Sequence, residues 1–348
     1  TLSVSGSTAT LTLNGTITIT AGTLVAGSAT NINVGVNWSA ATGSVFTAGI
    51  GTVTFNGSGA QQILGTLATK TFNNVVVNKT VATFLNTAGG TSTLTMNNLT
   101  MTQGDFTPPA TLNISGTLTL TTGTLTAGTN TNIGGDWTNS GGTFTPGAGT
   151  VTLNGSVAQA INGSVASHTF NNMTLNNSTG FTIAANVTVN GVLTFTSGNV
   201  STGANRLTIS STGSVVRTSG HVVGNFEKDV ATGATTRTFE IGDATNYTPV
   251  QVSFASVTTS GLLTASTTAG DHSDIANSAV DETQSVNRYW TVTNNGVVFT
   301  TYDATFTFVA GDIDGGVDPT QFIVGKLDGV TWTQPTVGTR TATTTQAT

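Results

Sequence analysis

Internal repetition at two scales constrains this sequence more than any other feature. The segment GTVTFNGSGAQQILGTLATKTFNNVVVN, which begins at Gly51, returns as GTVTLNGSVAQAINGSVASHTFNNMTLN from Gly149, at a 98-residue offset. A shorter 19-residue period relates Leu99 to Leu118 and Leu118 to Trp137. Repeats this short cannot bury a core individually, so the fold has to arise from the stacking of successive repeats.

The repeats carry the alternation that is typical of β-strands. In Thr16–Thr20 and Thr117–Thr121, Ile or Leu alternates with Thr, which predicts apolar side chains inside and Thr outside. A period this short does not suit a propeller blade, which needs roughly 40 residues or more. It suits one coil of two or three short strands. The sequence therefore predicts an all-β fold, with a parallel β-helix (β-solenoid) as its repeat region.

Glycine marks the expected corners of the coils. Asn-Gly pairs occur at residues 14–15, 56–57 and 154–155, where the glycines are expected to supply positive φ. Because Asn-Gly is also a strong hairpin signal, a series of antiparallel sandwiches is the alternative fold.

Charged residues are distributed unevenly, which places a domain boundary near Phe226. Residues 226–348 contain eighteen charged side chains, thirteen of them acidic, whereas residues 1–225 contain only six. Stacked coils would bring like charges together, so a solenoid tolerates few of them. We predict a β-solenoid repeat region at 1–225, with 19-residue coils and a 98-residue super-repeat, and an acidic β-sandwich domain at 226–348. The six charged residues of the repeat region are Lys70, Lys79, Asp105, Asp136, Arg206 and Arg217.

The second domain contains strand-like runs separated by turns rich in Gly and Asp, a pattern typical of a β-sandwich. The runs that predict strands are Pro249–Phe254, Leu262–Ser266, Arg288–Thr293, Ala304–Val309 and Phe322–Lys326. All four tryptophans are expected in the core, Trp38 and Trp137 in the solenoid and Trp290 and Trp332 in the sandwich.

Composition excludes several classes of protein. There is no Cys, which excludes disulfide scaffolds, thiolate nucleophiles and Cys-ligated metal sites. A net charge of -6 with nine Lys and Arg is unsuited to nucleic-acid binding. No apolar run approaches the ~20 residues of a membrane span. The first residues, TLSVSGSTAT, are not a signal peptide, and the weakly charged composition favours a secreted protein from which one has been removed.

One family resemblance follows from these residues. The pattern G-x-V-x-F/L-N-G, then Q-x-I or Q-A-I, then F-N-N resembles Bacteroidota-type secreted surface proteins, which are long repeat proteins exported by type IX secretion. The later run TRTFEIGDATNYTPVQVSF, with NRYWTV and YDATFTF, resembles the β-sandwich that often follows such repeats. The chain departs from that pattern where it stops at TATTTQAT, since similar proteins continue with a sorting domain. The resemblance implies the cell surface or extracellular matrix, and its motifs carry no catalysis.

Motifs for catalysis are missing, so the protein is not expected to be an enzyme or to need a cofactor. The sequence has no G-x-S-x-G, H-E-x-x-H or P-loop pattern. Its histidines, at 168, 221 and 272, lie far apart without ligand spacing. A hydrolase acting on polysaccharide is the alternative, with Glu227 and Asp229, or Asp281 and Glu282, as its carboxylate pair.

Three carboxylates in GDIDGGVD offer hard oxygen ligands. Asp312, Asp314 and Asp318 predict either a calcium loop or an acidic hairpin turn. The EF-hand pattern is not matched, because position 316 is Gly and the twelfth position is not Glu.

Threonine offers another surface. The chain contains 78 Thr, and Thr100/Thr102, Thr119/Thr121 and Thr138/Ser140 keep the 19-residue step. Such rows predict an outward ladder of the kind that binds ice in other β-solenoids, although Thr is also simply a good solvent-facing strand residue.

Taken together, these features favour a structural role. We expect a subunit of a bacterial extracellular filament, sheath or surface layer that assembles with itself by β-strand stacking or donor-strand exchange at its termini. Its C-terminal run, TRTATTTQAT, is strand-like and has no obvious core of its own. The alternative is a stalk-like adhesin that binds surface glycans through the second domain, around Asp271–Asp281 or Asp312–Asp318. Residues expected to make the assembly contacts are Thr1, Leu2, Val4, Thr341, Thr343 and Thr345.

Overall fold

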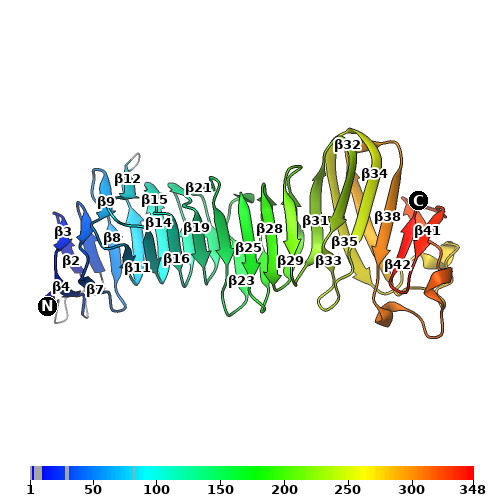
Figure 1. Cartoon of the computed structure of the whole chain (residues 1–348), viewed down its shortest axis with the longest axis horizontal. Coiled ribbons are helices and arrows are strands. Elements are labelled where there is room, and N and C mark those ends of the chain that lie inside the picture. Colours follow the sequence, from blue (N-terminus) through cyan, green and yellow to red (C-terminus); the bar gives the residue numbers. More distant parts are fainter. Residues whose placement is uncertain (1, 4–9, 28–30, 81–82) are drawn as a thin grey trace.

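The protein is an elongated β-solenoid followed by antiparallel sheets (Figure 1). The computed structural model describes residues 2–3, 10–27, 31–80 and 83–348. The solenoid makes about 11 turns, and the two termini lie toward opposite ends of the rod. The prediction of an all-β solenoid is confirmed. The alternative of antiparallel sandwiches is wrong for the repeat region, because the described strand pairings between β1 and β30 are parallel.

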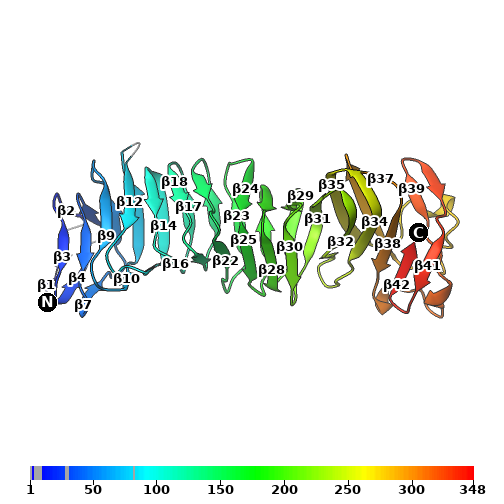
Figure 2. The same cartoon turned by 45° about the horizontal axis from the view of Figure 1, so that its top comes forward.

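Each turn of the solenoid contributes one strand to each of three faces (Figure 2). The first face is a 16-stranded sheet, here called the long sheet, which continues into the second domain. Along its main path the long sheet contains β2 (Thr10–Leu13), β5 (Asn31–Val34), β8 (Thr52–Phe55), β11 (Asn74–Asn78), β14 (Asn98–Gln103), β17 (Leu118–Leu120), β20 (Trp137–Asn139), β23 (Gln159–Asn162), β26 (Phe181–Ile183), β29 (Val200–Ile209), β31 (Val222–Val230), β35 (Gly261–Ala269) and β36 (Arg288–Asn295). It also includes β24 (Ser167–Phe170), β27 (Asn186–Val189) and β33 (Ile241–Gly242).

Three smaller sheets form the other two faces. The second sheet has eight strands: β10 (Thr69–Thr71), β13 (Thr93–Met96), β16 (Thr111–Ile114), β19 (Asn130–Ile133), β22 (Thr150–Leu153), β25 (Asn172–Asn176), β28 (Val192–Ser197) and β30 (Ser214–Arg217). The third sheet has seven: β3 (Ile17–Ile19), β6 (Trp38–Ala40), β9 (Gln61–Leu64), β12 (Phe84–Thr87), β15 (Asp105–Thr107), β18 (Thr124–Thr126) and β21 (Thr143–Thr145). At the N-terminal end lies a sheet of three: β1 (Leu2–Ser3), β4 (Gly22–Val25) and β7 (Ser44–Thr47).

The 19-residue step is the register of the central turns. Leu99 pairs with Leu118, and Leu118 pairs with Trp137. Other turns are longer, as the pairing of Val53 with Val75 and of Val75 with Leu99 shows. Most of the extra residues lie between the strands, and some are accommodated by register shifts within strands, as at Val77/Asn78 and Leu175/Asn176.

Alternating side chains divide between core and surface as the sequence predicts. Leu118 and Leu120 are fully buried, whereas Thr119 between them faces outward. One hydrophobic cluster extends along the solenoid and into the second domain, from Ile17 to Val297. Burial of this apolar column is the main favourable term in the stability of the rod.

The two copies of the 98-residue super-repeat lie on different faces. β8 belongs to the long sheet, and its counterpart β22, fourteen strands later, belongs to the second sheet. At three strands a turn, fourteen strands make four full turns and two further faces, so the second copy is displaced by two of the three faces about the axis. Sequence repetition alone does not reveal this rotation.

Each copy nevertheless keeps the same aromatic cluster inside. Trp38 packs edge-on against Phe46 at 4.6 Å and Phe72 at 5.1 Å between ring centroids. In the second copy, Trp137 packs against Phe144 at 4.7 Å and Phe170 at 5.0 Å. Both tryptophans are 1% exposed, which confirms that they are core residues.

The Asn-Gly glycines do not have the predicted positive φ. Gly15, Gly57 and Gly155 are all outside the set of positive-φ glycines. At Gly57 a Cβ would lie 1.9 Å from the carbonyl oxygen of Gly35 in the preceding coil. Glycine is therefore required at this corner by the close approach of two coils, not by backbone conformation.

The second domain begins without a break in the long sheet. β31 pairs in parallel with β29 of the solenoid and antiparallel with β35 of the sandwich, and Phe226 lies in its middle. Glu227 joins the two parts, because its carboxylate accepts hydrogen bonds from Thr208 on β29 and Thr264 on β35. The change from parallel to antiparallel pairing thus coincides with the change in charge density along the sequence.

The end of the long sheet faces a six-stranded sheet, here called the sandwich sheet. This sheet comprises β32 (Gly233–Phe239), β34 (Val250–Thr259), β37 (Val298–Phe299), β38 (Tyr302–Thr307), β41 (Val337–Arg340) and β42 (Thr344–Ala347). A hairpin, β39 (Lys326–Asp328) and β40 (Thr331–Thr333), and three 3-10 turns, η1 (Ile275–Asn277), η2 (Ala310–Asp312) and η3 (Pro319–Gln321), complete the domain. Four of the five predicted strands are present, but the run predicted at Phe322–Lys326 is mostly a loop.

The C-terminal run has a core of its own, contrary to expectation. β42 pairs with β38, and the side chains of Thr345 and Ala347 are buried against the domain. β41 covers the other edge of β42. Short-range pattern misses this pairing because the partner strand β38 is far away along the chain.

In the described part of the chain, no helix has the length and apolar character needed to cross a membrane.

Close packing of coils at glycine corners gives a direct test of the fold. We expect Gly123→Ala to lower the free energy of unfolding by about 2 kcal/mol more than Gly43→Ala. Both glycines have left-handed φ, 78° and 84°, so backbone strain is matched. A Cβ at Gly123 would lie 1.8 Å from the Gly104 carbonyl oxygen, whereas nothing lies within 4 Å at Gly43. Urea denaturation measures the difference, and equal losses would contradict the coil-contact argument.

Candidate functional site

A cavity of about 990 Å³ lies between the two sheets of the second domain. Its volume is at the upper end of the range of ligand pockets in proteins. Trp290 and Val292 line it from β36, while Tyr302 and Phe306 line it from β38. Val292 is 39% exposed although it lies on the face that points into the sandwich. The two sheets are therefore incompletely packed at this end.

One buried polar group on the cavity wall lacks a partner. Thr345 is 5% exposed and lines the cavity from β42. Within the described residues, its Oγ1 has no hydrogen-bond partner. Leaving a buried hydroxyl unpaired costs about 1–3 kcal/mol, so the site is suited to an occupant that supplies a polar atom here.

The tryptophans of this domain are not fully buried as expected. Trp290 and Trp332 are half-buried, and both line the cavity. The indole of Trp332 donates to Asp274, and its ring packs edge-on against His272. Their position in strand-like runs predicts burial, but burial depends on the opposite sheet, which does not fill this space.

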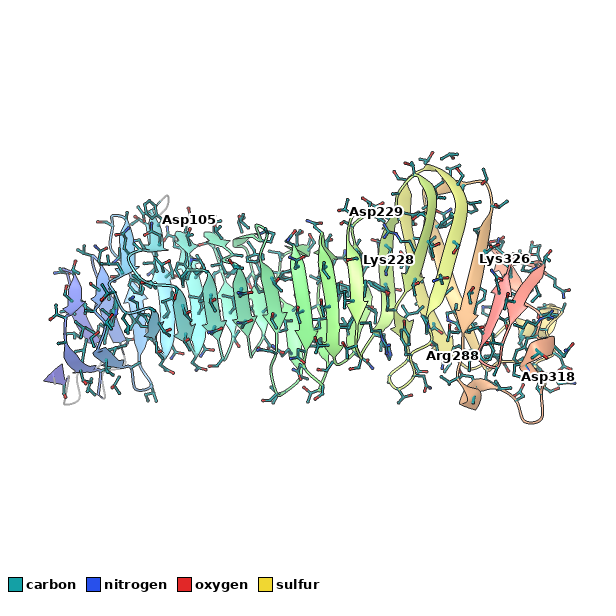
Figure 3. All side chains as sticks on the ribbon, in the orientation of Figure 1. Asp105, Lys228, Asp229, Arg288, Asp318 and Lys326 are labelled. Atoms are coloured by element: carbon teal, nitrogen blue, oxygen red, sulfur yellow. The ribbon has the colours of Figure 1, made fainter. Side chains whose placement is uncertain are left out.

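A buried ion-pair network closes one side of the cavity. The Arg288 guanidinium contacts both oxygens of Asp312 at 2.7 and 3.1 Å, and a second carboxylate, Asp243, at 2.6 Å. Burial alone would raise the pKa of Asp243, but backbone hydrogen bonds from Thr245 and Asn246, together with Arg288, hold it well below its usual value. The network fixes the start of β36, where Arg288 lies (labelled in Figure 3), against the rest of the domain.

The three carboxylates of the predicted calcium loop do not come together. Asp312 pairs with Arg288, and Asp314 accepts hydrogen bonds from the backbone of Ser285 and the amide of Asn287. Asp318 caps η3 by accepting from Thr320. Among the described residues, no group of three His, Asp or Glu side chains is arranged to hold a metal ion. The acidic turn interpretation fits this geometry, and calcium binding here stays a prediction.

The solenoid contains a different kind of site, a buried lysine held by neutral oxygens. Lys79 is fully buried, and its ammonium donates to the carbonyl oxygens of Gly57 and Gly59 and to Oε1 of Gln61, at 2.5–2.6 Å. None of these acceptors is charged. Burial therefore lowers the pKa of Lys79 to about 8.

The second super-repeat has an uncharged version of the same site. Asn177, the super-repeat counterpart of Lys79, donates to the Val157 carbonyl and to Oε1 of Gln159. Gln159 in turn bonds the backbone of the preceding coil at Ile133, as Gln61 does at Val34. In both sites a side chain donates hydrogen bonds to backbone carbonyl oxygens at a corner of the solenoid, so both sites have a structural role.

The two copies of the super-repeat also correspond at a second buried basic residue, which is Lys70 in the first copy and His168 in the second. Lys70 donates to the Leu67 carbonyl and to Thr91, and burial lowers the pKa of Lys70. Its counterpart His168 is 3% exposed and accepts a hydrogen bond from Trp137 at 3.2 Å. Burial lowers the pKa of His168 to about 4, so the ring is neutral at pH 7.

The other histidines remain separate from His168. His221 is buried near the junction beside the Asp243 carbonyl, and His272 packs against Tyr289. Burial lowers the pKa of His221, and the Asp243 carbonyl only partly offsets this effect.

The carboxylates considered for hydrolysis also have structural contacts. Glu227 is buried at the junction, and Asp281 accepts from Thr283 in its own turn. The two acidic residues of the repeat region bond the next coil, Asp105 at the Thr124 amide and Asp136 at the Ala160 amide. No pair of these groups is brought together by the contacts described.

The outward Thr ladder is present. Thr100 pairs with Thr119, and Thr119 with Thr138, on the long sheet. Ice binding by this ladder stays a prediction.

Only some of the predicted assembly residues can be placed. Thr1 and Val4 lie outside the described residues, and Leu2 belongs to β1, which pairs with β4. Thr341 and Thr343 are exposed in the turn between β41 and β42, whereas Thr345 is buried on the cavity wall. The terminal strand β42 is thus already paired within its own sheet.

Comparison with protein-family models, with curated proteins and with solved structures gives no match for this chain.

The oxygen cage of Lys79 makes a specific prediction. We expect Lys79→Met to lower the free energy of unfolding by about 3 kcal/mol, because Gly57, Gly59 and Gln61 lose their donor. Lys79→Asn introduces the residue of the second copy and should cost clearly less, because an amide retains donors. Urea denaturation followed by circular dichroism measures both variants. A Met variant as stable as the original chain would show that the cage contributes nothing.

Buried His168 predicts a loss of stability in weak acid. Its pKa is about 4 in the folded chain and 6.5 in an unfolded one, so between these values only the unfolded state takes up the proton. The free energy of unfolding should fall by roughly 3 kcal/mol as the pH drops from 7 to 4. His168→Gln keeps an acceptor for Trp137 without titrating, so its pH profile should be flatter. Identical profiles for the two proteins would contradict the assignment.

Proposed function

We propose that this protein is a structural subunit of a bacterial extracellular filament, sheath or surface layer. The observation that carries the proposal is the long sheet, which extends from β2 near the N-terminal end of the rod to β36 in the second domain. Within the described residues, neither end strand has a partner on its outer side. Unpaired strand edges are templates for the addition of another chain, and a head-to-tail contact that does not close produces a filament.

The composition of the rod supports the same role. The segment 1–69 contains no charged side chain, and most described exposed residues of the solenoid are uncharged Thr, Ser, Gly or Asn. Rods of this kind can associate without charge repulsion. The resemblance of the repeats to Bacteroidota-type secreted surface proteins supports a location at the cell surface or outside the cell, with export by type IX secretion.

A stalk-like adhesin is the second candidate, and the cavity favours it. Asp271, Asp281 and Asp318 are among the residues that line the cavity, together with the aromatic rings of Trp290 and Tyr302. Aromatic faces combined with carboxylates suit a sugar ligand, so the solenoid would act as a stalk and the second domain as the binding tip.

Electron microscopy separates the two candidates. We expect the full chain, concentrated without refolding, to form regular filaments with one subunit per axial repeat, because the long sheet of each molecule has one unpaired end strand at β2 and another at β36 among the described residues. Dispersed rods at every concentration would contradict the filament proposal. The adhesin would then be tested by calcium-dependent binding to a panel of surface polysaccharides.

A further inference from the structure

β36 differs from the other edge strands of the second domain. It pairs with β35 in continuous register from Arg288 to Asn295, and no described strand pairs with its other side. From residue 289 to 302 the chain has no charged residue and no Pro. Natural proteins usually protect sheet edges with charges, prolines or bulges, and beyond Arg288, whose guanidinium is buried in ion pairs with Asp243 and Asp312, this edge has none of them.

The sandwich sheet shows the protection that β36 lacks. Its edge strand β41 has an irregular register against β42 and contains Arg340, which bonds the Phe322 carbonyl. Its opposite edge, β32, has a register shift near Gly233 and contains Arg237. Since the same domain protects two edges and leaves a third one in continuous register and without charge from residue 289 onward, the exposure of β36 is a specific feature.

The cavity lies directly beside this open edge. Trp290 and Val292 of β36 line it, as do the side chains of Leu263 on β35 and Tyr302 on β38. A strand added next to β36 would alternate its side chains between the cavity and solvent. Its inward groups would cover Val292 and enter the cavity that Thr345 lines from the opposite sheet.

We propose that the β36 edge and the adjoining cavity accept a strand from a second copy of this chain, namely the β2 edge. β2 is the opposite end strand of the same sheet, so pairing it with β36 continues the long sheet from one molecule to the next. This inference rests on the proposed filament function and names its contact surfaces.

Electrostatics and side-chain pattern both select a second copy as the occupant. No charge occurs in 1–69 or in 289–302, so neither edge repels the other or loses ion hydration on contact. Leu11 and Leu13 of β2 alternate with exposed Thr10 and Thr12, and both leucines are only half-buried. Pairing would place the leucines on the cavity side and the threonines beside exposed Thr residues of β36.

Engineered disulfides test this contact in the full chain, which has no Cys of its own. Thr10→Cys or Thr12→Cys is combined with Thr291→Cys or Thr293→Cys, so that the four pairs cover neighbouring registers. Opposed strand residues have Cβ atoms roughly 5 Å apart, which is within reach of a disulfide after small adjustment. We expect at least one pair to give a ladder of linked chains on a non-reducing gel. Thr12→Cys with Thr119→Cys, in mid-sheet, is the control and should stay unlinked.

Charge at the edge provides the second test. Thr291→Lys with Thr293→Lys should abolish polymers seen by electron microscopy, because lysines block edge pairing. Thr119→Lys with Thr182→Lys adds the same charge on mid-sheet strands and should leave polymers intact.

The outcomes separate this inference from the filament proposal. Filaments that persist in the β36 lysine variant, or whose β36 cysteines stay unlinked, overturn the β36 contact and leave the filament proposal standing. Chains that remain single under all conditions overturn both, and β36 would then serve a foreign strand or a small apolar ligand. Linked ladders in the β36 pairs alone establish the contact.

Discussion

The structure depends on backbone hydrogen bonding between successive coils in parallel register. Most strand residues of the solenoid lie above a corresponding residue of the preceding turn, as Leu118 lies between Leu99 and Trp137. Stacking therefore aligns equivalent side chains of successive turns in columns. Columns that face the core must be apolar, and columns that face solvent must be uncharged. This requirement accounts for the abundance of Thr and Asn on the surface and for the scarcity of charge. It also explains why turns differ in length mainly at their corners, where no ladder has to be maintained.

The few charged side chains of the solenoid are accommodated by hydrogen bonds to nearby backbone atoms. Lys79 places its ammonium among backbone carbonyl and amide oxygens at a corner, and Asp105 accepts a backbone amide of the next coil. Each of these groups forms hydrogen bonds with backbone atoms at a corner of the solenoid, where those atoms have no partner in a neighbouring strand. Asn177 fills the role of Lys79 without charge in the second super-repeat, so the need at this corner is for donors and not for a cation. The buried, neutral ring of His168 also has a structural role, because it accepts a hydrogen bond from Trp137 inside the solenoid.

Features that depend on local alternation could be predicted from the sequence, whereas those that depend on which coils meet could not. The inward position of Leu118 and the outward position of Thr119 follow from a period of two. The role of Gly57 does not, because it is set by the carbonyl of Gly35 in the coil beneath it. One of the two partners of β42, β38, lies far away in sequence, which is why local pattern does not place the C-terminal strand inside the sandwich sheet. The cavity could not be predicted for the same reason, since the half-burial of Trp290 reflects a gap between two sheets and not any property of its own strand.

A repeating sheet has no intrinsic reason to stop, because the edge of its last strand is chemically the same as the edge of any interior strand. What decides whether the sheet ends within the molecule is protection of that edge. In the second domain, the irregular register of β41 and Arg237 on β32 provide such protection for the sandwich sheet, while the long sheet ends in β36 without it. The cavity beside β36 strengthens the contrast, because an edge that stays solvated would gain nothing from uncovered apolar side chains such as Val292. A further strand beside β36 would pair its free backbone edge and fill the cavity at the same time. The uncharged β2 edge of the same sheet is the strand whose side-chain pattern fits.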